Sequence, residues 1–122
     1  MMALDPRTAA RRAVAAHPDR PATAVLLDTP QMRLVVFRLA PGQAVPPHRS
    51  TSAVTLTVLE GSGLLSGEQE ERAYHTGEMA AYSPNETHGM RTTTQELLLL
   101  ACISPTPGAR TVTPHSVPER EG

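Results

Sequence analysis

The sequence predicts a single all-β domain, a sandwich, jelly roll or barrel, preceded by a short N-terminal helix. Residues 23–104 contain many short runs rich in Val, Leu, Ile and Thr, with Gly and Pro at the corners between them. Regular spacing of this kind is typical of antiparallel strands that enclose one core. Because no helical stretch separates the runs, a parallel sheet with crossover helices is not expected.

Composition narrows the classes of function. The chain has 122 residues and a net charge of −1, which suits one domain and provides no strong field for nucleic acid or an anionic membrane. No apolar run approaches the roughly 20 residues that a membrane span needs, and the first residues lack a signal-peptide pattern. Cys102 is the only cysteine, so an internal disulfide is impossible. A cytoplasmic protein is therefore expected, without nucleic-acid or membrane partners.

Residues 1–22 are expected to form a helix and a connecting arm. Asp5 can accept hydrogen bonds from first-turn N–H groups, and Pro6 suits the first helical position. The Ala-rich stretch that follows favours a helix as far as Ala16, and His17 and Pro18 end it.

The barrel strands follow in order along residues 23–104. Strands are expected at residues 24–27, 32–39, 54–59, 64–66, 72–75, 79–82, 87–93 and 96–104. The glycines at 61 and 63 indicate a corner, and residues 67–71 an exposed hairpin tip. Pro, Ser, Thr and charged residues dominate 105–122, where a flexible tail is expected.

Two glycine-histidine segments carry the chemistry. In the first, five residues separate Gly42 from His48, and Gly61 ends the segment; in the second, Gly77 precedes His88. Both spacings resemble the two metal-binding motifs of the cupin family. The resemblance covers residues 32–103 and implies a double-stranded β-helix, the cupin jelly-roll barrel.

The resemblance is incomplete at the ligand positions. Typical cupins hold Fe, Mn, Ni, Zn or Cu with three His and one Glu, whereas here Ser50 replaces the second His and Val54 replaces the Glu. The resemblance implies a divalent transition metal bound by His48 and His88. Its remaining coordination positions would be filled by water, His75, Cys102 or a ligand. The alternative is that the two histidines line a metal-free pocket, where neutral imidazoles can also transfer protons.

The remaining pocket residues follow from strand alternation. Residues at even spacing share one face of a strand, so four of them are expected to point into the barrel: Ser50, Val54, Leu56 and Val58. Met90 is the expected pocket residue after His88. Cys102 is counted with the pocket, although a free cysteine is usually a small core residue. Glu86 is a candidate acid or base at the mouth of the barrel, beside His88.

Three functions remain open from the sequence. The chain could be a metal-dependent enzyme of dioxygenase, isomerase or cyclase type, acting on a small molecule. It could instead bind a small ligand without metal in an apolar barrel, or act as a sensory module through a partner protein. A homodimer is expected, with residues 24–39 near the interface.

Overall fold

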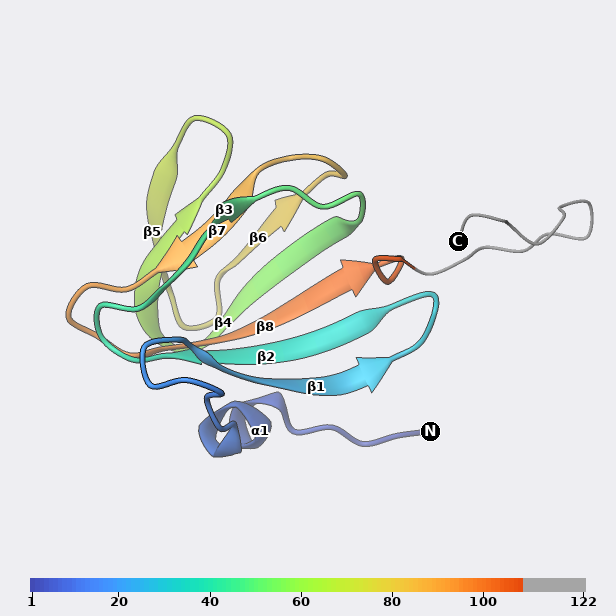
Figure 1. Cartoon of the computed structure of the whole chain (residues 1–122), viewed down its shortest axis with the longest axis horizontal. Coiled ribbons are helices and arrows are strands. Elements are labelled where there is room, and N and C mark those ends of the chain that lie inside the picture. Colours follow the sequence, from blue (N-terminus) through green and yellow to red (C-terminus); the bar gives the residue numbers. More distant parts are fainter. Residues whose placement is uncertain (109–122) are drawn as a thin grey trace, which may run out of the picture.

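The computed structural model describes residues 1–108, and there the prediction of an all-β fold with a short N-terminal helix is confirmed. Figure 1 shows the helix packed against a curled sheet whose two layers face each other. The elements are α1 (Pro6–Arg12), β1 (Ala22–Asp28), β2 (Arg33–Leu39), β3 (Ala44–His48), β4 (Ala53–Ser66), β5 (Glu71–His75), β6 (Met79–Tyr82), β7 (His88–Arg91) and β8 (Leu97–Ser104). From residue 109 the predicted flexible tail lies outside the described residues.

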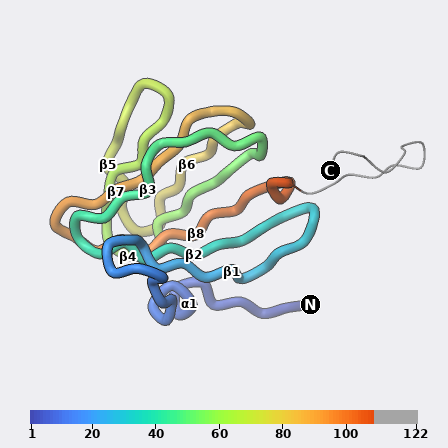
Figure 2. The backbone as a smooth tube through the Cα atoms, viewed as in Figure 1, coloured from blue at the N-terminus to red at the C-terminus, as the bar shows by residue number. Residues whose placement is uncertain are grey.

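Strand β4 joins the two layers. All strand pairs are antiparallel, and the main path through the sheet is β1-β2-β8-β4-β7-β3. The first half of β4 pairs with β8 and β6, and its second half pairs with β7 and β5. The hairpin of β4 and β5 projects beyond the rest of the backbone in Figure 2.

The corner predicted at residues 61–63 is a bend within one continuous strand. The register between β4 and β8 shifts between Val58 and Glu60, which marks a bulge. A bulge adds one residue to one strand and increases its local twist. Gly61 follows with φ 87°, a conformation that glycine adopts readily. The bend therefore turns β4 from one layer into the other without ending it.

The core lies between the two layers. It is built from alternate residues of β4 and β8 together with residues from β2, β6 and β7: Leu39, Val54, Leu56, Val58, Leu65, Tyr82, Met90, Leu97, Leu99 and Ala101. Full burial of each large aliphatic side chain contributes about 1.5–3 kcal/mol. Aliphatic residues therefore supply most of the stabilisation in a chain with few aromatic rings.

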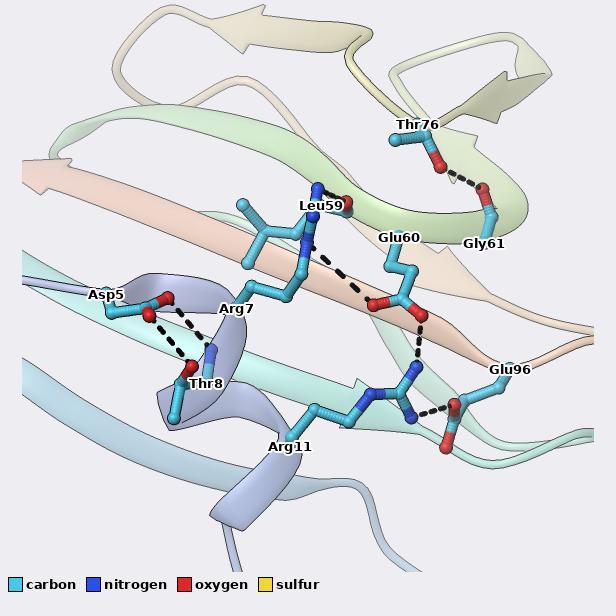
Figure 3. Close-up of polar contacts among 9 residues, drawn as sticks. All are labelled: Asp5, Arg7, Thr8, Arg11, Leu59, Glu60, Gly61, Thr76 and Glu96. Carbon is cyan, nitrogen blue, oxygen red and sulfur yellow. Dashed lines mark hydrogen bonds and ion pairs between the residues drawn. The ribbon is translucent and has the colours of Figure 1, made fainter.

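The helix begins as predicted but ends earlier. The Asp5 carboxylate accepts hydrogen bonds from the Thr8 backbone N–H at 3.1 Å and from its hydroxyl at 2.8 Å (Figure 3). The prediction that the helix continues to Ala16 is wrong, because α1 stops at Arg12 and Ala13 is extended. Arg38 on β2 donates to the carbonyl oxygens of Ala10 and Ala13, at 3.3 and 2.6 Å, and so satisfies the helix end.

Arginines on α1 tie the helix to the sheet. Arg11 pairs with Glu60 on β4 and, at 2.6 Å, with Glu96 just before β8 (Figure 3). Arg7 donates to the backbone oxygen of Leu59 at 2.9 Å. Because these groups are solvent-exposed, the ion pairs orient the helix more than they stabilise it.

The packed part of the chain extends past β8. Thr106 is buried, and its backbone N–H donates to the Pro30 oxygen at 3.1 Å. The Ser52 hydroxyl donates to the Pro105 oxygen. The expected dimer segment, residues 24–39, forms most of β1 and β2, and the homodimer stays a prediction. Within residues 1–108, no helix is long and apolar enough to cross a bilayer.

Candidate functional site

His48 and His88 lie side by side on neighbouring strands. Antiparallel pairing of β3 with β7 sets the two residues opposite each other. Their ring centroids are 4.2 Å apart, and the ring planes meet at 61° in an edge-to-face arrangement. His48 is exposed, whereas His88 is only 6% exposed. The two histidines singled out from the sequence are thus brought together by cross-strand register.

Both rings are oriented by the same local contact. The Nδ1 of His48 lies 3.0 Å from the Pro46 carbonyl oxygen, and the Nδ1 of His88 lies 3.3 Å from the Glu86 carbonyl oxygen. A carbonyl oxygen only accepts hydrogen bonds, so each Nδ1 carries the proton. Each neutral ring then keeps its Nε2 as an acceptor or ligand atom.

A cavity of about 400 Å³ opens beside the pair. Ser50 and Val54 line it together with the two histidines, as the strand spacing predicts. Its remaining lining residues, which sequence reasoning did not assign to the site, are Arg49, Thr51, Ile103 and Pro107. Ile103 pairs directly with Val54 across β8 and β4, so only strand pairing reveals it.

The other predicted pocket residues lie elsewhere. Leu56 and Val58, each 1% exposed, and Met90 are packed into the core between the layers. Cys102 alternates with Ala101 and Ile103 on β8, so its side chain lies on the opposite face from the cavity, because successive strand residues point to opposite faces. The structure thus brings four of the eight predicted metal and pocket residues together at one cavity: His48, His88, Ser50 and Val54. Glu86, the candidate acid or base, lines a different cavity.

Tyr82 is a neighbour of the site that sequence reasoning did not assign to it. Its ring centroid lies 5.3 Å from that of His88, and its hydroxyl donates to the Ser66 oxygen at 3.0 Å. Burial raises the pKa of Tyr82 to about 12, so the phenol is neutral at physiological pH. Residues alternate between the two faces of β6, so Tyr82 shares the inward face with Ala80. This alternation could have predicted its position from the sequence.

Comparison with known proteins identifies the family. The model of the cupin domain matches residues 35–104, more than half of the chain. The chain is a cupin. No protein of curated function matches its sequence.

Several solved structures share this fold. A protein from Thermus thermophilus is 26% identical with a TM-score of 0.73, over 80% of this chain and 94% of its own. An RmlC-like cupin from Desulfovibrio desulfuricans is 24% identical with a TM-score of 0.68, over 77% of this chain and 91% of its own. A predicted oxalate decarboxylase from Thermotoga maritima is 20% identical with a TM-score of 0.66, over 70% of this chain and 81% of its own.

The donor set of this cupin does not fit a resident transition metal. Such metals are usually held by three or four protein ligands, and here two imidazoles face a Ser hydroxyl and a Val side chain. Among residues 1–108, no three His, Cys, Asp or Glu side chains are grouped as metal ligands. Cys102 lies on the other face of β8, and His75 lines a different cavity with Ser62.

His88 should make the stability of the protein depend on pH. Burial is the largest cause lowering its pKa, and nearby His48 lowers it further. An unfolded His titrates near pH 6.5, so below that pH the unfolded state binds more protons than the folded state. The contribution of His88 is therefore complete above about pH 6.5 and is lost as pH falls through its folded pKa.

Urea unfolding at about pH 7.5 and about pH 5.5 measures this dependence. We expect His88→Gln to lose less stability over this range than the wild type. His75→Gln, which changes an exposed His on β5, should keep the wild-type dependence. An identical pH dependence in wild type and His88→Gln would contradict the assignment.

Proposed function

We propose that this cupin binds a small organic molecule in the cavity beside His48 and His88, without a resident metal. The observation that carries the proposal is the contact that both rings share: each Nδ1 lies against a backbone carbonyl oxygen, at 3.0 and 3.3 Å, so the Nε2 of each neutral ring is left as an acceptor. The ligand is a compound with a hydroxyl or N–H donor on an apolar body. Its donor would bond to the imidazoles.

The cavity walls suit such a molecule. Val54, Ile103 and Pro107 supply apolar surface, and Ser50 and Thr51 add hydroxyl groups. Sites for small molecules typically combine apolar walls with a few placed polar groups in about 300–1,000 Å³. A pair of neutral imidazoles beside a bound hydroxyl also provides a proton acceptor, so acid–base chemistry on the ligand is compatible with this site.

A metal-dependent enzyme is the second candidate. The observation that favours it is the proximity of the two rings, with centroids 4.2 Å apart and the Nδ1 atom of each ring against a backbone carbonyl oxygen. His48 and His88 would hold a divalent metal, which would supply Lewis-acid chemistry. Ser50 and Val54 weigh against it, because neither replaces the missing imidazole and carboxylate ligands.

Metal content and probe binding distinguish the two candidates. Elemental mass spectrometry on protein purified without chelator or polyhistidine tag gives the metal per chain. We expect less than stoichiometric metal, even after incubation with Fe, Mn, Ni, Zn and Cu. Stoichiometric metal that is lost in His48→Ala would support the second candidate and contradict the first.

Phenol and toluene test the ligand class, since they differ by the one hydroxyl donor. In a backbone amide NMR titration, phenol should bind about tenfold more tightly than toluene, with shifts at His48, Val54 and His88. His88→Ala should remain folded and lose this preference, whereas His75→Ala should keep it. Equal affinities for the two probes, or shifts confined to another face, would contradict the proposal.

A further inference from the structure

A second and larger cavity, of about 650 Å³, lies between β6 and the hairpin of β4 and β5. It forms because β6 pairs with residues 54–57 of β4, whereas β5 pairs with residues 62–66 beyond the bend. The hairpin therefore diverges from β6 beyond the bend in β4 (Figure 2). The histidine site does not use this cavity.

Apolar and aromatic side chains form one part of its lining. Leu65 and Tyr82 belong to the core, and Tyr74 and Ala80 pack against that core from the edge. The Tyr82 hydroxyl is already bonded to the Ser66 oxygen at 3.0 Å, so its ring offers mainly apolar and π surface. A ligand with an apolar body therefore fits this part of the cavity.

Three carboxylates and the Arg72 guanidinium line the other part, and the carboxylates are not equally neutralised. Glu68 pairs with Arg49 at 2.7 Å, and Glu70 pairs with Arg72 at 3.2 Å. Glu86 accepts the backbone N–H of Ser83 at 2.8 Å and, among residues 1–108, has no ion-pair partner. Glu86 is also partly buried, whereas Glu68 and Glu70 are exposed.

We propose that this cavity binds a small organic cation, an amine with an apolar body. The ammonium group pairs with the Glu86 carboxylate, and the body lies against Tyr74, Tyr82 and Leu65. A cation near tyrosine faces gains further electrostatic stabilisation, which a neutral molecule of the same shape lacks. Arg72 also lines the cavity but is paired with Glu70, so the charge at Glu86, unpaired within the described residues, favours a cation over an organic anion.

The two cavities are adjacent but separate. Tyr82 lines the larger one, and its ring packs 5.3 Å from His88, which lines the smaller one. Amine binding therefore does not require the imidazoles. This proposal can be tested independently of the function proposed for the histidine site.

Phenethylamine and 2-phenylethanol test the proposal, since they share a body and differ in charge. In an NMR titration at neutral pH and low salt, phenethylamine should bind about tenfold or more tightly than the alcohol. Shifts are expected at Tyr74, Tyr82 and Glu86. Glu86→Gln should lower the affinity for the amine about tenfold and leave that for the alcohol unchanged.

Two controls separate this site from other effects. Asp19→Asn removes one exposed carboxylate away from the cavity, and it should leave amine affinity unchanged. His48→Ala should do the same, even if it abolishes phenol binding. Equal affinity for amine and alcohol, no effect of Glu86→Gln, or an equal loss in Asp19→Asn would overturn the proposal.

Discussion

Gly61→Ala should be among the most destabilising single substitutions in this cupin, with a loss of about 4 kcal/mol or more of unfolding free energy. Two effects add. The residue has φ 87°, where a side chain costs about 1–2 kcal/mol. A Cβ at this position would also overlap the backbone carbonyl of Glu96, which cannot rotate away as a side chain could. Urea unfolding followed by circular dichroism measures the loss.

Two other glycines separate these effects. Gly77 has φ 90° but open space around it, so Gly77→Ala should cost only the conformational term, about 1–2 kcal/mol. Gly67 has open space and no positive φ, so Gly67→Ala should be neutral or slightly stabilising. An equal or smaller loss of unfolding free energy in Gly61→Ala than in Gly77→Ala would contradict the close contact between Gly61 and the Glu96 backbone.

Gly61 also marks a limit of reading a fold from sequence. Its place in the glycine pattern indicated a corner, and a change of direction is found there. The sequence could not indicate that β4 continues through the corner, because the bulge depends on pairing with β8, whose residues 97–104 lie far along the chain. The early end of α1 has a similar cause, since Arg38 from β2 binds its last carbonyls.

The candidate site was predictable where spacing alone carries the signal. The resemblance to the cupin motifs named His48, Ser50, Val54 and His88, and these residues share one cavity. Ile103 comes from another strand and depends on register, so it was missed for that reason. Tyr82 was missed although the alternation of β6 could have indicated it. Cys102 lies on the outer face of β8, which the alternation with Ala101 could have indicated. Strand parity therefore gives the face of a side chain, but it did not separate Val54, which lines the cavity, from Leu56 and Val58, which lie in the core.

Introducing an imidazole at position 50 and a carboxylate at position 54 should produce the largest change in metal affinity. We expect Ser50→His with Val54→Glu to bind Zn²⁺ at least about a hundredfold more tightly than the wild type. Both positions line the cavity with His48 and His88, so the double variant would present three imidazoles and one carboxylate. Isothermal titration calorimetry with Zn²⁺ measures the change.

Stability provides a second and independent readout of the same variant. Val54 is 3% exposed, so a carboxylate there is costly without a partner, and the metal-free double variant should melt below the wild type. Zn²⁺ binds the folded state, so its addition should raise the Tm of the variant much more than that of the wild type. Such a rise in Tm would show that the bound Zn²⁺ compensates the buried carboxylate at position 54.

The matched control moves the carboxylate by one residue. Thr55 pairs with Cys102 on the outer face of β4, so Ser50→His with Thr55→Glu adds the same groups but directs the carboxylate away from the cavity. This control should gain little affinity and show little metal-dependent rise in Tm. Equal gains in the two double variants would mean that position 54 does not face the histidines. A gain confined to the Val54→Glu variant would show that two substitutions separate this cavity from a four-ligand metal site.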